Sequence, residues 1–438
     1  MQLARRMRFR LSDHESRRVK VEIAIWSRRS LFILGGIVVG AAAVGMAVLA
    51  DVAQHAFHAL AVRWPRAPLA ITPVGFALAV YVTRRFFRNS EGSGIPQAIA
   101  ARQLADQAAR ARLVSIRLAI GKVLVTVFGL LCGASAGREG PTVQVGASVM
   151  FAVGKLSPRR QPGLILAGAS AGVAAAFNTP LAGIVFGIEE MSRSFEARAS
   201  GLIIAGIIAA GLASRSLVGE YTYFGTSSAT IQGGLGWLAV LICGVAGGVF
   251  GGVFSRILIE VGRGLPGTAG RAIRRYPVGF AAICGLGVAL CGLVPGVTVY
   301  GTGYDQARAM LESGVLTSPW FGILKLVATI FTSISGIPGG IFSPSLAVGA
   351  GIGANIAAFL PGVSFSAIVI LGMVSYFAGV VQAPITAFTI VTEMTNDHTM
   401  VVPLMTAALI GHAVSRLVCH EGVYHALSKN YLRSPARP

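Results

Sequence analysis

The sequence is poor in charged residues, and most of the charge that it carries is positive. Only 12% of its 438 residues are Asp, Glu, Lys or Arg, whereas 54% are hydrophobic. Together with a mean hydropathy of +0.70, this composition excludes a water-soluble globular protein and is typical of a protein with many membrane-spanning segments. No stretch of the chain is left over for a separate soluble domain.

Cysteine is also scarce, and the patterns of several enzyme and metal sites are missing. The five cysteines form no CxxC pair and are joined by no histidine cluster, which argues against a metal centre or a disulfide framework. We therefore expect no metal and no cofactor. The sequence also has no G-x-S-G segment, and His412 has no evident partner. An intramembrane serine protease is thus disfavoured, and we expect no enzyme.

The net charge of +20 raises the question of a nucleic-acid partner. No aromatic-rich soluble module accompanies this charge, so no nucleic acid is expected. The basic residues gather instead in short segments: residues 1–30 hold nine Lys or Arg, and others lie in 155–160, in 263–275 and near the C-terminus. Short basic segments are retained on the cytoplasmic side. This pattern predicts a multi-pass protein of the cell (inner) membrane with both termini in the cytoplasm.

Uncharged stretches predict spans of unequal length. Residues 30–50 and 237–255 are long enough to cross a bilayer, whereas 142–154 and 383–392 are too short. Short segments are tolerated where their ends face protein or a water-filled cavity, so we expect tilted and broken helices. We predict a basic cytoplasmic arm at residues 1–30 and a cytoplasmic tail at 421–438. Between them we expect a first transmembrane repeat at 31–220, a connection at 221–236 and a second transmembrane repeat at 237–420.

The two halves of the chain repeat each other at a distance of about 203 residues. This spacing relates Lys122 to Lys325 and Gly146 to Gly349, and one more residue relates Pro180 to Pro384. In both halves a Gly- and Pro-containing segment interrupts the apolar pattern, at 137–141 and at 336–344. Such a repeat points to a transporter with a binding site where the repeats meet.

Three segments place glycine and proline where an apolar helix should begin. A helix N-terminus presents unpaired amide groups and the positive end of the helix dipole, and it binds anions without a full charge. Weak binding of this kind suits conduction, whereas a Lys or Arg in the path would hold an anion too tightly. Helix breaks without a ligand remain the alternative. The three segments are Gly92-Ser93-Gly94-Ile95-Pro96, Gly137-Arg138-Glu139-Gly140-Pro141 and Gly340-Ile341-Phe342-Ser343-Pro344.

These segments, in this order, resemble the signature segments of the CLC chloride channels and proton-coupled chloride exchangers. The stretch from Phe177 to Gly183, the pair Glu189-Glu190 and the stretch from Glu393 to Thr395 add to the resemblance, which covers roughly residues 30 to 430. It implies an all-helical membrane protein with two repeats of inverted topology. It also implies a homodimer with one pore in each subunit. The short C-terminus resembles that of prokaryotic relatives without cytosolic regulatory domains.

The resemblance further implies which residues bind chloride. Ser93 would donate its hydroxyl to a central chloride, aided by the backbone N–H groups of Ile341 and Phe342. Tyr424 would be a second hydroxyl donor; its alternatives are an interfacial aromatic anchor or a replacement by Tyr431. Ser93 accompanies chloride preference in the family. Gln97 departs from the family, in which many members have an acid at this position.

Glu139 is a carboxylate at a helix N-terminus in the membrane, where it can compete with an anion for the same place. Carboxylates within a membrane are costly and are therefore expected to be functional or paired. Protonation would release Glu139 and open the path, and the resemblance makes it the family's gating glutamate. A salt bridge to the adjacent Arg138 is the alternative, although neighbouring helical residues point in different directions.

Glu190 resembles the internal proton-transfer glutamate of the exchangers, where passive channels have a non-ionisable residue. It favours a chloride/proton antiporter over a passive chloride channel, which remains the alternative function. A structural pair with Arg193 is the other interpretation of Glu190. We expect the adjacent Glu189, whose repeat partner is Glu393, to be a structural carboxylate that caps or pairs near the cytoplasmic ends of helices.

Overall fold

The computed structural model of the protein describes residues 13–156, 160–192, 201–219, 224–225, 229–231, 233–294, 296, 298–314 and 318–433. Within these residues the chain is helical, and its only β-type pairings are two isolated bridges. The predicted all-helical class is confirmed. Part of the predicted connection between the repeats, at 221–223, 226–228 and 232, lies outside the described residues.

Most predicted spans correspond to observed helices, with ends that differ by a few residues. The first half contains α1 (Asp13–Arg63), α2 (Pro68–Phe86), α3 (Ile95–Gln103), α4 (Gln107–Ala111), α5 (Ile116–Leu131), α6 (Glu139–Val153), α7 (Gln161–Phe177), α8 (Pro180–Phe186) and α9 (Gly201–Val218). The second half contains α10 (Gly233–Arg263), α11 (Gly267–Arg275), α12 (Pro277–Cys291), α13 (Tyr304–Ser313), α14 (Phe321–Ile334), α15 (Phe342–Ala357), α16 (Phe365–Val381), α17 (Pro384–Thr395), α18 (Val401–Val418) and α19 (Val423–Arg433). A 3-10 turn, η1 (Gly154–Leu156), follows α6, and a π-helical turn, η3 (Gly187–Ser192), follows α8.

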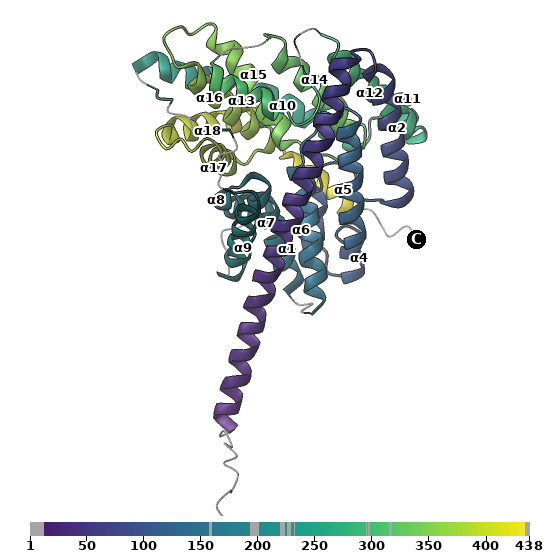
Figure 1. The fold of residues 1–438 in the computed structure, drawn as a ribbon, viewed down its shortest axis with the longest axis vertical. Coiled ribbons are helices and arrows are strands. Elements are labelled where there is room, and N and C mark those ends of the chain that lie inside the picture. Colours follow the sequence, from purple (N-terminus) through teal and green to yellow (C-terminus); the bar gives the residue numbers. More distant parts are fainter. Residues whose placement is uncertain are drawn as a thin grey trace, which may run out of the picture.

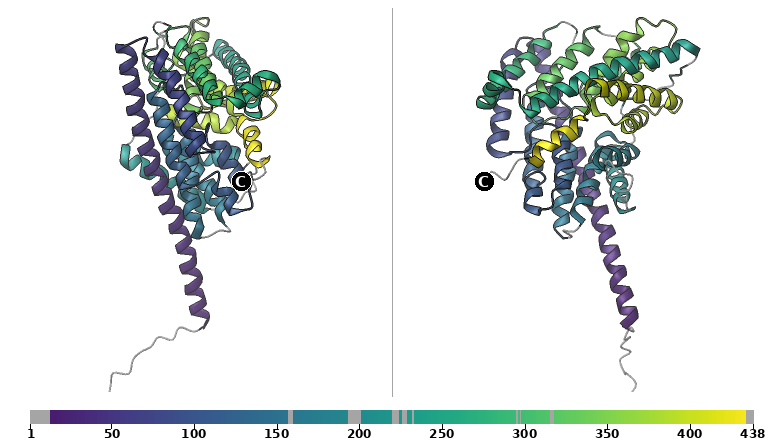
Figure 2. Two further views of the ribbon diagram at one scale, coloured as in Figure 1. Left: turned by 90° about the vertical axis from the view of Figure 1, so that its right-hand side faces the viewer. Right: turned by 180° about the vertical axis from the view of Figure 1, so that it is seen from behind.

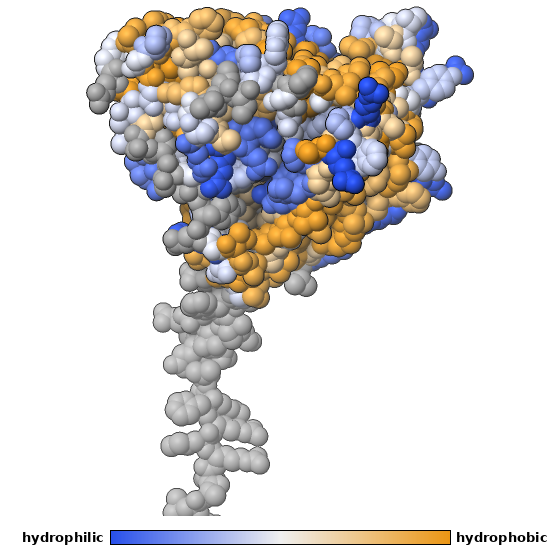
Figure 3. Space-filling model, turned by 45° about the horizontal axis from the view of Figure 1, so that its top comes forward, coloured by the Kyte–Doolittle hydropathy of each residue, from blue (hydrophilic) through white to orange (hydrophobic). Residues whose placement is uncertain are grey.

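Few of these helices are complete membrane spans. Among the described residues, five are long and apolar enough to cross a membrane, or six if α11 and α12, bent by 104°, form one broken span. The others are shorter, as the short uncharged stretches predict. Hydrophobic side chains cover much of the face shown in Figure 3, which is the surface that a lipid environment requires.

Helix α1 is longer than predicted. It contains 51 residues, begins within the segment predicted to be a basic arm and extends well beyond the rest of the molecule (Figure 1). The reason lies in the local sequence, since neither glycine nor proline occurs between Asp13 and Ser30 or between Asp51 and Arg63. A helix continues until such a residue stops it, and Trp64-Pro65 follows its end.

The repeat is visible in how helices cross. Helices α6 and α7 approach each other at Gly146 and Gly168, and α15 and α16 approach each other at Gly349 and Gly372. A Cβ atom on any of these glycines would overlap the backbone of the opposite helix. Small residues allow this close contact between helices in membranes. The equivalent crossings in the two halves confirm the internal repeat.

Helix α19 lies within the molecule, although residues 421–438 are predicted to be a tail. It packs against α3 of the first half and α10 of the second. In the right-hand view of Figure 2 this helix, drawn in yellow, runs across the middle of the protein. The burial of Val423, Tyr424 and Ala426 explains this position, since an isolated helix of this length is marginally stable in water. Helix α19 is therefore part of the fold.

Candidate functional site

The three glycine- and proline-containing segments meet, and backbone hydrogen bonds join them. Gly92 donates its N–H to the carbonyl of Ile337 (3.2 Å) and accepts from the N–H of Gly339 (3.0 Å). Gly137 and Gly340 exchange two hydrogen bonds of 2.7 Å each. Gly137 and Gly340 are related by the repeat, so this reciprocal pair lies where the two halves face each other. The structure thus brings the segments predicted to form the site into one place.

Glycine is required for this contact. A Cβ atom on Gly140 would lie 2.5 Å from Oγ of Ser93 and 3.2 Å from Cα of Gly340. Gly94, the residue before α3, has a left-handed backbone with φ of 95°, which glycine adopts without strain. The N-terminal ends of α3, α6 and α15 therefore approach one another more closely than residues with side chains would permit.

The hydroxyl groups of Ser93 and Tyr424 face the same place. Tyr424 is only 1% exposed, and its hydroxyl lies within interacting distance of Ser93. Neither oxygen makes a hydrogen bond of normal geometry to a described residue. Buried hydroxyls nearly always have a partner, so a pair without one requires an explanation. A small anion that accepts from both hydroxyls would supply it.

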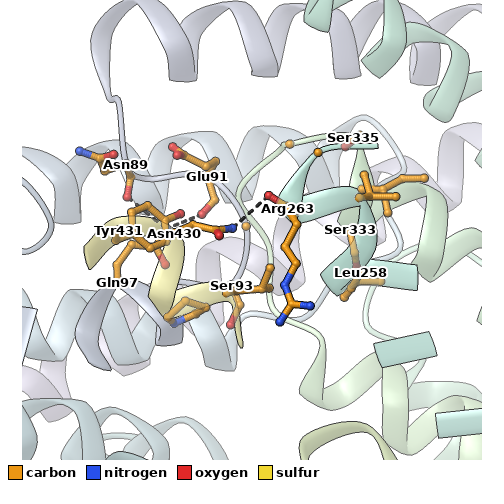
Figure 4. Close-up of a pocket in the computed structure, with 18 of the residues that line it drawn as sticks. Asn89, Glu91, Ser93, Gln97, Leu258, Arg263, Ser333, Ser335, Asn430 and Tyr431 are labelled. Atoms are coloured by element: carbon orange, nitrogen blue, oxygen red, sulfur yellow. Dashed lines mark hydrogen bonds between the residues drawn. The ribbon is translucent and has the colours of Figure 1, made fainter. Parts of the chain in front are cut away.

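Burial decides between the interpretations of Tyr424. An interfacial anchor has its polar end at the membrane surface, which the buried Tyr424 does not; that interpretation is wrong. Tyr431 lies beside Gln97, at one side of a cavity (Figure 4). Gln97 donates hydrogen bonds to the carbonyls of Asn89 and Glu91, which a carboxylate at this position would not do.

Phe342, the first residue of α15, is the centre of a cluster of aromatic rings. Its ring stacks on Phe177 at 6.0 Å, meets Phe377 edge to face at 4.9 Å and lies 5.9 Å from the ring of Tyr424. Phe186 completes the cluster. The three phenylalanine partners come from α7, α8 and α16 and were not predicted as site residues. Their packing holds the start of α15 and positions Tyr424.

Glu139 is completely buried at the first position of α6. Ser343, at the start of α15, donates its hydroxyl to Oε1 of Glu139 at 2.5 Å. The side chain is therefore held between the N-terminal ends of two helices from opposite halves. The guanidinium of Arg138 is directed towards α1, where it pairs with Asp51 at 2.5 Å and donates to the carbonyl of Ala47.

Glu190 lies in the π-helical turn η3, and its side chain is buried. Both Glu190 and Glu139 are close enough to act electrostatically on Tyr424. Two side chains hold the turn: Arg102 donates to the carbonyl of Met191, and His425 bonds the carbonyl of Glu190. The predicted alternative partner, Arg193, lies outside the described residues. Turns of this kind are frequent at functional sites.

Glu189 and Glu393 cap helices in the opposite repeat. Glu189 accepts from the backbone N–H groups of Ile385 and Thr386 at the start of α17. Glu393 accepts from those of Leu181 and Ala182 at the start of α8. These bonds confirm the prediction that Glu189 is a structural carboxylate, and they show that its repeat partner Glu393 has the same role.

Lys122 and Lys325 occupy equivalent positions, and sequence reasoning did not predict their structural role. Each is fully buried. Lys122 donates to the carbonyls of Ser90 and Gly92, and Lys325 donates to those of Val299 and Gly301. Each lysine therefore fixes the loop that leads into a short helix, α3 or α13.

The bonds of Lys325 reveal a counterpart of the first signature segment, at Gly301-Thr302-Gly303. Gly303 precedes α13 with φ of 78°, as Gly94 precedes α3. Thr302 thus corresponds to Ser93, but its hydroxyl and N–H both donate to Oε1 of Gln54, at 3.3 Å. The spacing in this pair is 209 residues rather than 203, so the fixed repeat distance did not reveal it.

A cavity of about 870 Å³ opens onto the site. Ser93, Ile341 and Tyr424, three of the four residues predicted to bind chloride, line it. Figure 4 shows Ser93 and Arg263 along this cavity. Its other basic residues are Arg84, Arg88, Arg112 and Arg274. A basic lining raises the local concentration of anions, so the cavity can lead anions to the buried hydroxyls.

Comparison with known proteins agrees with this geometry. Residues 75–416 match the family described as voltage gated chloride channel. The chain belongs to this chloride channel family. Within the family it is 30% identical over 376 residues to the "H(+)/Cl(-) exchange transporter ClcA" of Vibrio campbellii, with 82% of this chain and 78% of that protein covered. The protein of the same name from Yersinia pestis is 28% identical over 403 residues, which cover 86% of this chain and 80% of that protein.

Solved structures of other CLC proteins have the same fold. A slow cyanobacterial Cl-/H+ antiporter superposes with a TM-score of 0.77 at 24% identity, covering 93% of this chain and 98% of that one. A CLC-type fluoride/proton antiporter gives 0.76 at 21% identity, with 92% and 98% covered. At these identities the likeness establishes the architecture, and the roles of individual residues must be argued from this chain.

Proposed function

We propose that this family member is a chloride/proton antiporter. Chloride binds between the hydroxyls of Ser93 and Tyr424 and the backbone N–H groups of Ile341 and Phe342. Glu139 acts as the gate, and Glu190 is the internal proton-transfer group. No cofactor takes part in this mechanism. We infer from membership of the chloride channel family that the protein is a transporter and not an enzyme.

The placement of Glu139 is the observation that carries the proposal. Its carboxylate lies between the starts of α6 and α15, where amide groups and helix dipoles favour negative charge. A chloride ion seeks the same environment, so the carboxylate and chloride compete. Protonation removes the charge of Glu139 and lets it leave, which couples the movement of an anion to that of a proton.

The chloride site is suited to binding and release. Two buried hydroxyls that have no hydrogen-bond partner among the described residues and the N-terminal amides of α15 supply donors without a full positive charge. Binding of this strength allows release. The arginines line the cavity that leads to the site. From there they attract anions without holding them at the site. The names of the ClcA relatives, exchange transporters of H+ and Cl-, support the same ions.

Glu190 favours antiport over the alternative function, a passive chloride channel gated by voltage or pH. A channel needs no second protonatable group along the path, and a buried carboxylate is costly in a membrane. Glu190 supplies such a second group, and its charge, like that of Glu139, acts on Tyr424.

The test is transport by protein reconstituted into liposomes. A chloride gradient is expected to drive protons uphill, and the reversal potential is expected to shift with an imposed pH gradient. In the Glu139→Gln variant, proton movement is lost and chloride flux remains; Glu190→Gln is expected to uncouple the ions in the same way. A reversal potential that ignores the pH gradient identifies a channel. Undiminished proton pumping in both variants contradicts the two assigned roles.

The remaining features of the proposal concern the setting of the protein. The basic segments and the spans favour a cell (inner) membrane location with both termini in the cytoplasm. We infer a homodimer in the lipid bilayer, with one pore in each subunit, from the resemblance to the family. Chemical cross-linking in liposomes tests the dimer, and accessibility of a cysteine placed in α19 tests the side on which the C-terminal region lies.

A further inference from the structure

His425 lies between the buried carboxylate of Glu190 and the surroundings of the protein. It follows Tyr424 directly in α19. Its Nε2 atom is 2.8 Å from the backbone oxygen of Glu190 and 3.6 Å from Oε1 of the same residue. The side chain of His425 is 15% exposed, whereas that of Glu190 is 3% exposed. Exchange of protons between Glu190 and water therefore needs an intermediate group or a change in structure, and the imidazole is in place for it.

The chemistry of imidazole suits this position. One ring nitrogen accepts a proton while the other donates one, and the ring titrates close to neutral pH. We propose that His425 transfers protons between the cytoplasmic solution and Glu190. This inference rests on the proposed antiport, in which Glu190 must gain and lose a proton in each cycle.

The transfer balances as follows. A proton from water binds Nδ1 of His425, and the proton on Nε2 passes to Oε1 of Glu190. The ring and the carboxyl group are then both neutral, and one proton has moved from solution to Glu190. The starting tautomer returns when the ring turns towards the solution, releases the proton on Nδ1 to water and takes one on Nε2. The distance of 3.6 Å has to shorten by about half an ångström to reach hydrogen-bond length, or one water molecule has to bridge it.

The surrounding charges are few and mostly paired. On the elements packed against α19, the described residues supply Arg102 on α3, which bonds the carbonyl of Met191, in addition to Glu190 on η3. At the start of α19, Glu421 pairs with Lys429 on α19 and with Arg263 on α10. Arg256 and Glu260, also on α10, pair with each other.

A merely structural role for His425 is the competing explanation. The hydrogen bond to the carbonyl of Glu190 holds η3, as the bond from Arg102 does. Glutamine separates the two roles, because its amide donates to a carbonyl but does not carry a proton from one side to the other. His420, which is exposed in the loop before α19, offers a matched control on the same region of the protein.

The experiment compares wild type, His425→Gln and His420→Gln in liposomes, with proton and chloride fluxes recorded over a range of pH. We expect His425→Gln to lower chloride-driven proton flux by about tenfold or more and to remove the dependence of that flux on pH near the titration range of imidazole, about 6.5. Chloride binding, measured by calorimetry in detergent, stays unchanged. His420→Gln behaves as wild type. In His425→Ala, added imidazole restores proton flux, a result that remains informative if the glutamine variant is unstable.

Each outcome decides a different question. A proton flux and pH dependence in His425→Gln equal to those of wild type overturn the role of His425 and leave the antiport intact. Failure of imidazole to restore flux to a folded, chloride-binding His425→Ala variant overturns it as well. Absence of coupled proton movement in wild type overturns the proposed antiport and, with it, this inference.

Discussion

The two repeats share a backbone plan but differ in the side chains at the site. Gly137 and Gly340 are equivalent and pair with each other, yet the position two residues later is Glu139 in one repeat and Phe342 in the other. In the same way, Glu190 corresponds to Met394. One repeat therefore supplies the titratable groups, and the other supplies an aromatic ring and backbone amides.

Positions that the two halves share support the scaffold. Lys122 and Lys325 fix equivalent loops, and Glu189 and Glu393 cap each other's helices. Positions at which the halves differ carry the proposed chemistry. Two repeats with identical side chains would offer equivalent proton-binding groups in both halves. The proposed antiport therefore depends on side chains that differ between the repeats.

Ser93 and Thr302 show the same contrast. The turn at Thr302 is closed by a protein oxygen, Oε1 of Gln54, which accepts from both the hydroxyl and the N–H of Thr302. The hydroxyl of Ser93 makes no such bond. Equivalent turns thus end in a structural contact in one repeat and in an unsatisfied donor in the other.

The largest expected effect on stability comes from the buried lysines. Lys122→Met and Lys325→Met each remove the donor for two buried carbonyls, and each is expected to destabilise the protein by about 2 kcal/mol. A thermal melt in detergent measures the loss. Because Gly92 adjoins Ser93, Lys122→Met is also expected to weaken chloride binding, whereas Lys325→Met is not. Equal chloride affinity in the two variants contradicts this distinction.

The reciprocal caps predict a second matched pair. Glu189→Ala and Glu393→Ala each leave two backbone N–H groups at a helix start without an acceptor, with an expected cost of about 1 to 2 kcal/mol. Thermal melts of both variants are expected to shift by similar amounts. Glu190→Gln, next in sequence to one of them, is expected to leave the melting temperature nearly unchanged. A larger decrease in melting temperature for Glu190→Gln than for Glu189→Ala would contradict the structural role of Glu189 and the transport role of Glu190.

Ser93→Ala and Thr302→Ala sharpen the contrast between the two turns. Loss of the Ser93 hydroxyl removes one donor to chloride, which we expect to cost about 1 kcal/mol, or roughly fivefold in affinity. Calorimetric titration with chloride measures this change. Thr302→Ala leaves chloride affinity as it is, since Gln54 rather than an anion occupies that turn. Equal losses of chloride affinity in Ser93→Ala and Thr302→Ala would contradict the inference that only the turn at Ser93 binds chloride.

The smallest expected effect concerns an ion pair in the loop before α19, beyond the candidate spans. Hydrogen bonding to Lys429, with the nearby charge of Arg263, lowers the pKa of Glu421 below its ordinary value. A lowered pKa means that the stabilisation is present above the ordinary carboxylate range and is lost as the pH falls through the lowered value. Because Glu421 is largely exposed, Glu421→Gln is expected to cost less than about 1 kcal/mol at pH 7. The difference from wild type in thermal melts should disappear in acid, and a constant difference at all pH values contradicts the ion-pair origin.

Much of the site can be predicted from local sequence. The site residues that were not predicted share a physical reason. The glycine and proline segments mark the starts of α3, α6 and α15, and the sequence also predicts the structural role of Glu189. The aromatic partners of Phe342 and the contact of His425 with Glu190 come from helices far apart in the sequence. No periodic pattern encodes such pairs, because their side chains look like ordinary core residues until the helices are packed.

The extent of the first and last helices shows the same limit. The basic composition of residues 1–30 and 421–438 suggests an arm and a tail, but α1 continues where no residue stops it and α19 is anchored by buried side chains. The density of basic residues indicates on which side of the membrane a segment lies. It does not indicate how far a helix extends or whether that helix packs against the rest of the protein.

By itself, the sequence determined the membrane class, the internal repeat and the places where helices begin, since hydropathy and the backbone restrictions of glycine and proline act locally. The tertiary structure alone decided which helix starts meet, which buried hydroxyls remain without a protein partner and which histidine reaches Glu190. These features depend on contacts between residues some 200 positions apart, which form only when the two halves pack against each other.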